Sequence, residues 1–401
     1  MVLLSYFAYF FYYFTRKHLG ITTNALIESG YSENLIAWTQ TGYGVCYAIG
    51  QFMSGALGDR LGPRIALAMG MILSAIASLA FGIFPFMGVM AICLTLNGLF
   101  QSTGWSNGCK VVSQWVVHKH RGRVMGAWCT CYIFGSLLAN ITAGYVLGNY
   151  GWRQVFLVTG VIVIVVGIVQ AIFLINRPED AGYSVERRES TNTDSERNQK
   201  SGFMLMIRQP TIIMLGLAYT GQKFIRYTFF AWLPYYLASS VMLSDEKSAY
   251  VSNGFEVGGI LGLIIGGFVA DKYFRKNKTR LAFFSLLAMV GSLLFYLAIS
   301  KTGGVWGNVF GLAGIGFFLY IADSIVSGTA AQDVGGADNT ASAAGIINGI
   351  GSLAQPLAGF VPILLKNKWG WDSVFICFIC VTIFSALVLL PISLKKQINK
   401  A

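Results

Sequence analysis

Long apolar segments follow one another along nearly the whole chain, and this succession constrains the fold more than any other feature. Of the 401 residues, 55% are hydrophobic and only 11% are charged, and the mean hydropathy is +0.61. A membrane-spanning helix needs about 20 apolar residues, so with its turn it uses roughly 33 residues, and the chain accommodates about twelve. We therefore expect an all-α integral membrane protein without a soluble catalytic domain, and not an enzyme.

The apolar runs are separated by Gly, Pro and charged residues, and they predict twelve transmembrane helices in contact with the lipid bilayer. The helices are expected near residues 2–28, 34–58, 65–83, 88–117, 122–148, 152–175, 208–238, 247–270, 280–299, 305–332, 338–365 and 371–394.

Basic residues are unevenly distributed between the loops on the two sides of these helices. Nineteen of the 29 Lys and Arg residues fall in the termini and loops of one side, and five fall in the loops of the other. The positive-inside rule then predicts that both termini and the 176–208 loop are cytoplasmic. The net charge of +12 reflects this bias, so nucleic acid is not an expected partner.

An internal repeat divides the chain into two halves. The segment 55–64 (GALGDRLGPR) recurs in weaker form at 267–276, an offset of 212 residues, and small residues at four-residue spacing precede both copies. Such spacing lets two helix backbones approach closely. We expect two pseudo-symmetric six-helix bundles, 1–176 and 208–401, joined by a polar cytoplasmic linker, 177–207.

Five basic residues fall inside the predicted helices: Arg16, Lys17, Lys110, Lys223 and Arg226. A cation at the bilayer centre costs at least about 2.5–3.5 kcal/mol, so it is retained where it has a partner or an aqueous cavity. Arg16 and Arg226 are 210 residues apart, close to the repeat, and are expected to face each other. Two guanidinium groups match a phosphate dianion, and when empty they are expected to repel each other by about 3 kcal/mol.

The 55–64 element resembles the signature loop of the major facilitator superfamily. Three further segments resemble the organophosphate:phosphate antiporter family: Tyr12-Tyr13-Phe-Thr-Arg16-Lys17, Arg226-Tyr227 followed by Trp232, and Gly104-Trp105 through Lys110. The similarity extends over the chain. It implies a monomeric transporter in the plasma membrane, of the bacterial inner-membrane type, that exchanges an organic phosphate ester for inorganic phosphate by alternating access.

The resemblance also implies roles for individual residues. Arg16 and Arg226 would bind the phosphoryl group, and the remaining candidate substrate-binding residues are Tyr9, Tyr13, Lys17, Tyr47, Trp105, Trp128, Lys223 and Tyr320. The sequence departs from the family pattern at Gln51, Tyr132, Lys223, Asp323 and Ser352, so the organic part of the substrate does not follow from the resemblance.

Several charged residues are candidates for ion pairs. Lys223 is expected either to pair with Asp323 or Glu256, the preferred interpretation, or to contact an additional carboxylate on the substrate, as in a phosphoglycerate. Lys17 and Glu256 are expected to form a bridge that breaks during transport, or else a permanent pair. In the signature loops, Asp59, Arg60, Arg64 and Asp271 are expected to form a cytoplasmic latch, or only to set the topology.

No metal or cofactor is expected. The seven cysteines lie in apolar stretches, and Cys377-x-x-Cys380 lacks His or acidic residues at ligand spacing. Two other functions stay open: a membrane sensor of sugar phosphates with little transport, and a proton-coupled anion symporter that uses Glu256 and Asp323.

Overall fold

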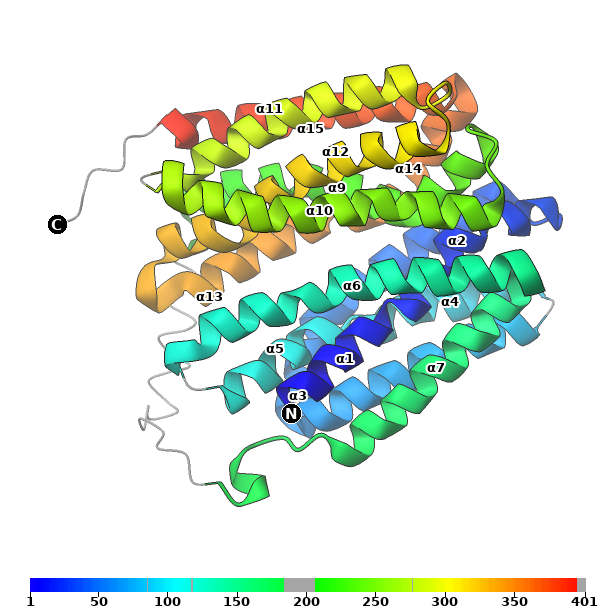
Figure 1. Cartoon of the computed structure of the whole chain (residues 1–401). Helices are drawn as coiled ribbons and strands as arrows, with labels where there is room; N and C mark the ends of the chain where they lie inside the picture. Colours follow the sequence, from blue (N-terminus) through cyan, green and yellow to red (C-terminus); the bar gives the residue numbers. More distant parts are fainter. Residues whose placement is uncertain (85, 117, 184–205, 276, 395–401) are drawn as a thin grey trace. The chain divides into compact units, whose positions relative to one another are not determined.

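The computed structural model describes the chain except for residues 85, 117, 184–205, 276 and 395–401. Its elements are α1 (Val2–Tyr12), α2 (Phe14–Glu28), α3 (Glu33–Ile83), α4 (Met87–Gln101), α5 (Thr103–Trp115), α6 (His118–Tyr150), α7 (Trp152–Phe173), η1 (Glu179–Ala181), α9 (Pro210–Ser239), α10 (Asp245–Tyr273), α11 (Lys278–Ile299), α12 (Gly304–Ser324), η2 (Ile325–Thr329), α13 (Ala330–Ser352), α14 (Ala354–Trp369) and α15 (Trp371–Leu394) (Figure 1).

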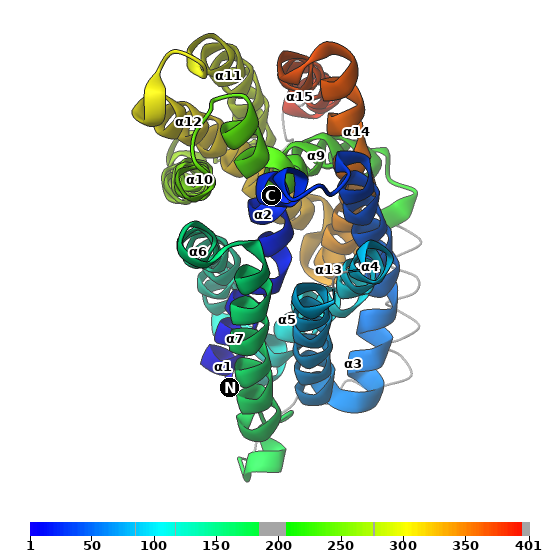
Figure 2. The same cartoon turned by 90° about the vertical axis from the view of Figure 1, so that its right-hand side faces the viewer.

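The contacts between residues divide the chain into two compact units. The first contains 1–187, 228–252 and 355–363, and the second contains 188–227, 253–354 and 364–401. In the first unit α3 packs against α4, α5 and α7 (Figure 2). In the second, α11 packs against α12 and α15.

The first unit therefore includes short segments from the second half of the sequence. The boundaries expected from the repeat, 1–176, 177–207 and 208–401, stay a prediction. Most of the expected linker lies outside the described residues.

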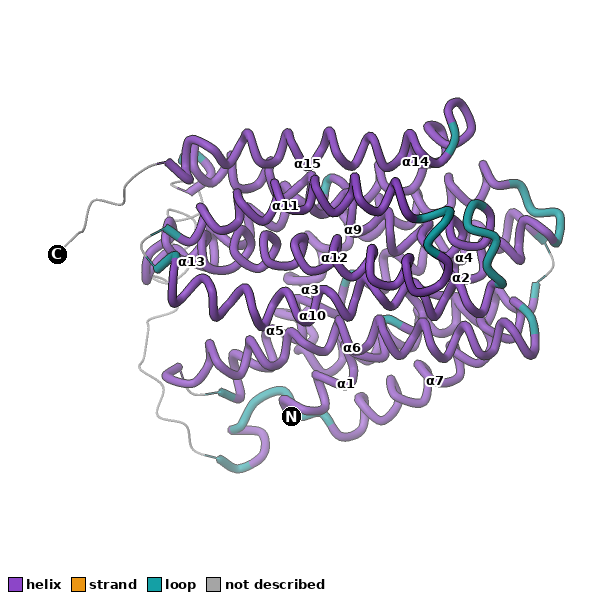
Figure 3. The backbone as a smooth tube through the Cα atoms, turned by 45° about the horizontal axis from the view of Figure 1, so that its top comes forward, coloured by secondary structure: helices purple, strands orange, loops and turns teal. Residues whose placement is uncertain are grey.

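The described residues form helices and loops, with no strand among them (Figure 3). Eight helical segments in this part of the chain are long and apolar enough to cross a membrane: Arg60–Ile83, Ala127–Tyr150, Trp152–Phe173, Asp245–Tyr273, Lys278–Ile299, Gly304–Gly328, Ala343–Trp369 and Trp371–Leu394. None of them contains a buried cation named in the sequence analysis, because α2, α5 and α9 carry those residues. α2 and α5 are too short to cross a membrane by themselves, with 15 and 13 residues, and polar side chains lower the hydropathy of α9.

The helix bounds correct the predicted spans in the middle of several helices. The span expected at 2–28 is interrupted at Tyr13, whose N–H bonds to the carbonyl of Phe10, three residues back. The span expected at 88–117 is interrupted at Ser102 in the same way. Such tight turns leave the sequence periodicity almost unchanged, so a hydropathy pattern does not reveal them.

Two further corrections concern the second half of the chain. The helix expected at 305–332 ends at Ser324 and continues as a π-helical turn, η2, and the helix expected at 338–365 is replaced by α13 and α14, which meet at Leu353. α13 begins at Ala330 and includes the residues expected to form the preceding loop.

The loop at the signature element is a sharp bend within α3. Gly62 has φ 79° and ψ 154°, a backbone conformation that favours glycine, and it separates the helices expected at 34–58 and 65–83. A Cβ at Gly62 would lie 2.6 Å from the Asn176 side chain, so glycine also provides the space.

Candidate functional site

Arg16 lies on α2, in the first unit, and all three of its guanidinium nitrogens donate to neutral oxygens. Its Nε donates to Gln101 Oε1 at 3.1 Å, and its Nη2 lies 3.5 Å from the Gln101 carbonyl oxygen. Its Nη1 lies 3.4 Å from the Tyr13 hydroxyl. Neutral acceptors orient a guanidinium without cancelling its charge, so Arg16 remains available to an anion.

Gln101 is itself held firmly. It is fully buried at the end of α4, and its Nε2 lies 3.1 Å from the Tyr12 carbonyl oxygen, 2.8 Å from Thr15 Oγ1 and 2.9 Å from Ser74 Oγ. The amide orientation follows from these partners, because Nε2 faces a carbonyl oxygen and Oε1 faces the arginine. The network places the Arg16 guanidinium before any ligand binds.

Aromatic rings surround the same guanidinium. The Cζ atom of Arg16 lies 4.8 Å from the ring centroid of Tyr13, 5.1 Å from that of Tyr47 and 5.8 Å from that of Tyr9. The structure thus brings together the three tyrosines of α1, α3 and the α1–α2 break that the sequence predicted at this site. Ring faces attract a cation, with the larger effect where water is excluded.

Trp105 and Trp128 lie behind Tyr9. Their ring centroids are 5.6 and 5.5 Å from that of Tyr9, and Trp128 Nε1 donates to Ser5 Oγ at 3.1 Å. No contact between these two tryptophans and Arg16 is recorded among the described residues. Their predicted substrate contact stays a prediction, and what the structure shows is support of the Tyr9 ring.

Lys17, next to Arg16, is also buried in the first unit, with 5% of its surface exposed. Its ammonium nitrogen lies 4.1 Å from the ring centroid of Phe230. Glu256 belongs to the second unit, and the predicted Lys17–Glu256 bridge stays a prediction.

Arg226, on α9 in the second unit, differs from Arg16 in having a carboxylate partner. Its Nη1 lies 3.0 Å from Asp323 Oδ1, and the two side chains are 12% and 6% exposed. Its Nε is buried without a hydrogen-bond partner among the described residues. The Tyr227 ring centroid lies 5.7 Å from its Cζ atom. Asp323 therefore compensates the charge of Arg226, and the repulsion expected between the two arginines stays a prediction.

Lys223 lies one helical turn before Arg226. Its Nζ donates to Asn348 Oδ1 at 2.6 Å, to the Asn348 carbonyl at 3.2 Å and to Ser352 Oγ at 2.8 Å. The Tyr219 ring centroid lies 4.9 Å away. Asp323 pairs with Arg226. The expected ion pair of Lys223 with Asp323 or Glu256 and its expected substrate contact both stay predictions.

Tyr320 and Glu256 form a buried pair in the second unit. The Tyr320 hydroxyl donates to Glu256 Oε2 at 3.0 Å, and the two residues are 0% and 1% exposed. The predicted lining role of Tyr320 stays a prediction.

The interruptions of the helices lie beside these residues. Tyr13 precedes Arg16 by less than one turn, Ser102 follows Gln101, η2 begins two residues after Asp323, and Leu353 follows Ser352. Interruptions inside membrane helices are typical of binding sites, because they turn side chains and free backbone groups toward a ligand.

The signature-loop residues have local roles in the structure. Arg64 Nε donates to the Ala171 carbonyl at 2.6 Å and its N–H to Asn176 Oδ1 at 2.9 Å, so it caps the end of α7. Asp271 pairs with Lys278 at 2.8 Å on the surface. Arg60 is exposed, and the Asp59 side chain lies outside the described part of the structure. The latch stays a prediction.

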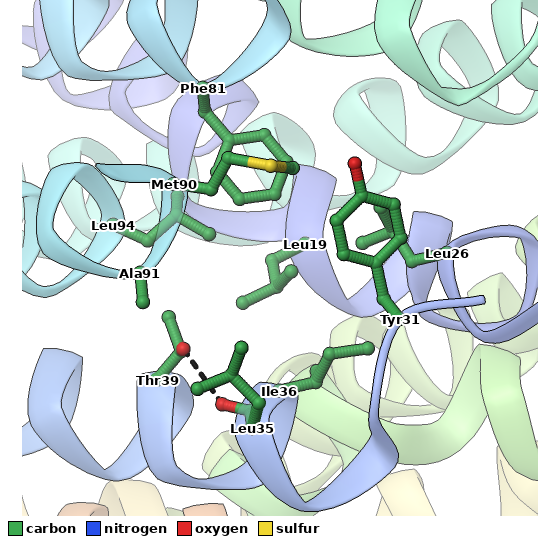
Figure 4. A pocket seen from close by; sticks show the side chains of 10 residues that line it. All are labelled: Leu19, Leu26, Tyr31, Leu35, Ile36, Thr39, Phe81, Met90, Ala91 and Leu94. Atoms are coloured by element: carbon green, nitrogen blue, oxygen red, sulfur yellow. Dashed lines mark hydrogen bonds between the residues drawn. The ribbon is translucent and has the colours of Figure 1, made fainter. Parts of the chain in front are cut away.

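A pocket elsewhere in the first unit does not suit an anion. Figure 4 shows its lining, which is almost wholly apolar and includes Leu19, Leu26, Met90 and Leu94. The hydroxyl of Thr39 is already bonded to the Leu35 carbonyl at 2.8 Å. Within the described ranges, no group of three or more His, Cys, Asp or Glu residues could hold a metal ion.

Sequence reasoning missed Gln101, Asn348, Tyr219 and Tyr227. Gln101 and Asn348 are polar residues inside apolar helices, which is a usable signal, but the sequence does not show which of them face the arginines. Tyr219 and Tyr227 are one turn from the cations on α9, and their spacing could have indicated them.

Partly buried arginines among aromatic side chains in a multi-pass helical protein are typical of a membrane transport protein. Comparison with known proteins agrees: the Major Facilitator Superfamily profile matches residues 5–359. Human Sugar phosphate exchanger 3 is 30% identical over 94% of this chain and 83% of its own length. Putative glycerol-3-phosphate transporter 5 of Arabidopsis thaliana is 30% identical over 88% of this chain and 78% of its own length.

Solved structures support the same fold. A bacterial homologue of the human lysosomal transporter Spinster superposes with a TM-score of 0.81 at 13% identity, covering 100% of this chain and 98% of that one. The D-xylose-proton symporter gives 0.75 at 15% identity, with 97% and 96% covered. The chain belongs to the Major Facilitator Superfamily, and within it to the organophosphate:phosphate antiporter family. The twelve-helix fold expected from the sequence is confirmed.

Proposed function

We propose that this protein exchanges an organic phosphate ester for inorganic phosphate across a membrane by alternating access. The observation that carries the proposal is the Arg16 guanidinium, which is held by Gln101 and Tyr13 through neutral oxygens and keeps its charge. The names of the relatives, sugar phosphate exchanger and glycerol-3-phosphate transporter, support this class of substrate.

Phosphate suits this chemistry. A guanidinium donates two parallel hydrogen bonds to a phosphoryl group, and the sequence repeat assigns Arg226 as the second such donor. We propose that Arg16 and Arg226 both bind the phosphoryl group. We further propose that the organic part contacts Tyr9, Tyr13, Tyr47 and Tyr320, and that Lys223 receives a carboxylate where the substrate has one.

Alternating access is supported by close packing within the first unit. A Cβ at Gly20 of α2 would clash with the carbonyl oxygen of Phe230, and a Cβ at Gly44 of α3 would lie 2.9 Å from the Pro356 nitrogen. Phe230 lies in the part of α9 that we propose to face away from the cytoplasm, and Pro356 lies near the start of α14. Glycines at these contacts let the helix backbones meet closely, and we propose that this packing allows the transport path to close.

The proposed orientation rests on the positive-inside bias, which places both termini in the cytoplasm of a plasma membrane. We also propose that the protein acts as a monomer. Single cysteines introduced at Ser240 and Ser201 test this topology. In the proposed orientation, a thiol reagent that does not cross the membrane should label the cysteine at 240 from outside and the cysteine at 201 only from inside.

Counterflow tests the proposed exchange. Proteoliposomes loaded with inorganic phosphate should accumulate external radiolabelled phosphate transiently. External glycerol 3-phosphate, glucose 6-phosphate or 3-phosphoglycerate should compete if it is a substrate. Phosphate efflux without a counter-substrate would contradict strict exchange, uptake that requires a pH gradient would favour the proton symporter, and saturable binding without any transport would favour the sensor.

Gly20→Ala is expected to lower the exchange rate about tenfold while phosphate still binds, because the added methyl group overlaps the Phe230 carbonyl and prevents closure. Initial rates of exchange and equilibrium phosphate binding measure the two effects separately. Gly291→Ala on α11 is the matched control, since a Cβ there meets open space. Equal rates for the two variants would show that closure does not depend on this contact.

A further inference from the structure

The two arginines receive their acceptors from corresponding helices of the repeat. Gln101 ends α4, in the fourth span of the first half, and Asp323 is the penultimate residue of α12, the fourth span of the second half. A helix interruption follows each of them closely: Ser102 directly follows Gln101, and η2 begins two residues after Asp323. The fourth span of each half therefore carries a side chain that accepts from an arginine, an amide toward Arg16 and a carboxylate toward Arg226.

Because one acceptor is an amide and the other a carboxylate, the two half-sites differ in net charge. Gln101 accepts from Arg16 at 3.1 Å and leaves one positive charge, whereas Asp323 accepts from Arg226 at 3.0 Å and cancels it. An anion that approaches Arg226 therefore also meets the negative charge of Asp323. A carboxylate that lies beside the bound anion in a partly buried site repels it and so weakens its binding strongly.

The Arg226 guanidinium nevertheless keeps a side for a ligand. Asp323 contacts Nη1, and Nε is buried with no partner in the described part of the chain. Arg16 Nε, by contrast, is occupied by Gln101. A buried N–H without an acceptor is unfavourable, so a phosphoryl oxygen that reaches Arg226 Nε satisfies it.

We propose that Asp323 is an internal counter-anion that competes with the phosphoryl group for Arg226 and thereby sets the affinity of the second half-site. The inference rests on the proposed function and assigns a specificity-determining role that Gln101 does not share. An exchanger must release its anion in each half-cycle, and a competing carboxylate favours that release. Arg16 then supplies most of the phosphoryl affinity.

Asp323→Asn tests this competition, because it keeps an oxygen toward Arg226 Nη1 and removes the charge. The half-saturating concentration of inorganic phosphate, measured by equilibrium binding to the purified protein, should fall at least about tenfold. The maximal exchange rate should fall as well, since release becomes slower. Asp372→Asn is the matched control: its carboxylate pairs with Lys301 at 2.9 Å in the same unit but is half exposed.

A second readout does not depend on phosphate. Phenylglyoxal modifies guanidinium groups, and mass spectrometry of the peptides quantifies modification of Arg226. Without phosphate, modification of Arg226 should be faster in Asp323→Asn than in the wild type, while Asp372→Asn should leave it unchanged. If the wild type neither binds nor exchanges phosphate, the proposed function fails, and this labelling still tests the pairing.

An unchanged or raised half-saturating concentration in a well-folded Asp323→Asn protein would overturn the proposal. Should that variant not be monodisperse, Asp323→Glu, which retains the charge, must bind phosphate within about threefold of the wild type. A clear gain in affinity with the charge retained would overturn the proposal equally.

Discussion

Arg16→Lys is expected to reduce phosphate exchange by at least roughly a hundredfold, which corresponds to about 3 kcal/mol of lost interaction. Lysine retains the charge, but its ammonium cannot reproduce the planar set of donors that reaches both Gln101 oxygens and the Tyr13 hydroxyl. Gln101 Oε1 would then be left buried without its donor. Initial rates of phosphate exchange in proteoliposomes measure the loss.

Two further variants calibrate this result. Arg153→Lys, at the start of α7 where Arg153 stacks on Trp152 at 4.8 Å, should exchange at the wild-type rate. Arg226→Lys should lower the rate of phosphate exchange less than Arg16→Lys does, because Asp323 already compensates the charge of Arg226. An Arg16→Lys protein with near wild-type exchange would contradict the role of the guanidinium.

Gln101→Glu is expected to cause a comparable loss of exchange, again roughly a hundredfold. It places a carboxylate 3.1 Å from Arg16 Nε, which cancels the charge available to the substrate. It also replaces the Nε2 donor and leaves an oxygen facing the Tyr12 carbonyl, which repels it. Phosphate binding and exchange should both fall, with the protein still folded.

Gln170→Glu separates this effect from the general cost of burying a carboxyl group. Gln170 on α7 is as buried as Gln101 and lies in the same unit, and no hydrogen bond joins it to Arg16. The Gln170→Glu protein should therefore be less stable but retain its phosphate affinity. If both variants lose affinity equally, Gln101 has no special relation to Arg16.

Much of the fold could be predicted from the sequence. Hydropathy and the 212-residue repeat predict the twelve helices, because spanning a bilayer imposes length and composition on each one. The interruptions at Tyr13, Ser102 and η2 could not be predicted in this way. They change the hydrogen bonding of one turn while the apolar pattern continues.

The site was predictable where the bilayer makes a residue conspicuous. Arg16, Arg226 and Lys223 were found because charge inside an apolar helix is costly. Gln101 was missed because an amide is tolerated in a helix, and its importance comes from a contact between α4 and α2. The Arg226–Asp323 pair was missed for a related reason. Lys223, expected to pair with Asp323 or Glu256, is three residues from Arg226 on α9, and spacing alone does not show which cation lies beside Asp323.

The central claim is that one phosphoryl group binds both Arg16 and Arg226. Protection from phenylglyoxal, measured by mass spectrometry on both peptides of one sample over a phosphate titration, tests it most directly. The account predicts that a single phosphate concentration half-protects both arginines, while Arg64, which caps α7, stays unprotected. Protection of one arginine alone, or protection of the two at clearly different concentrations, would contradict it.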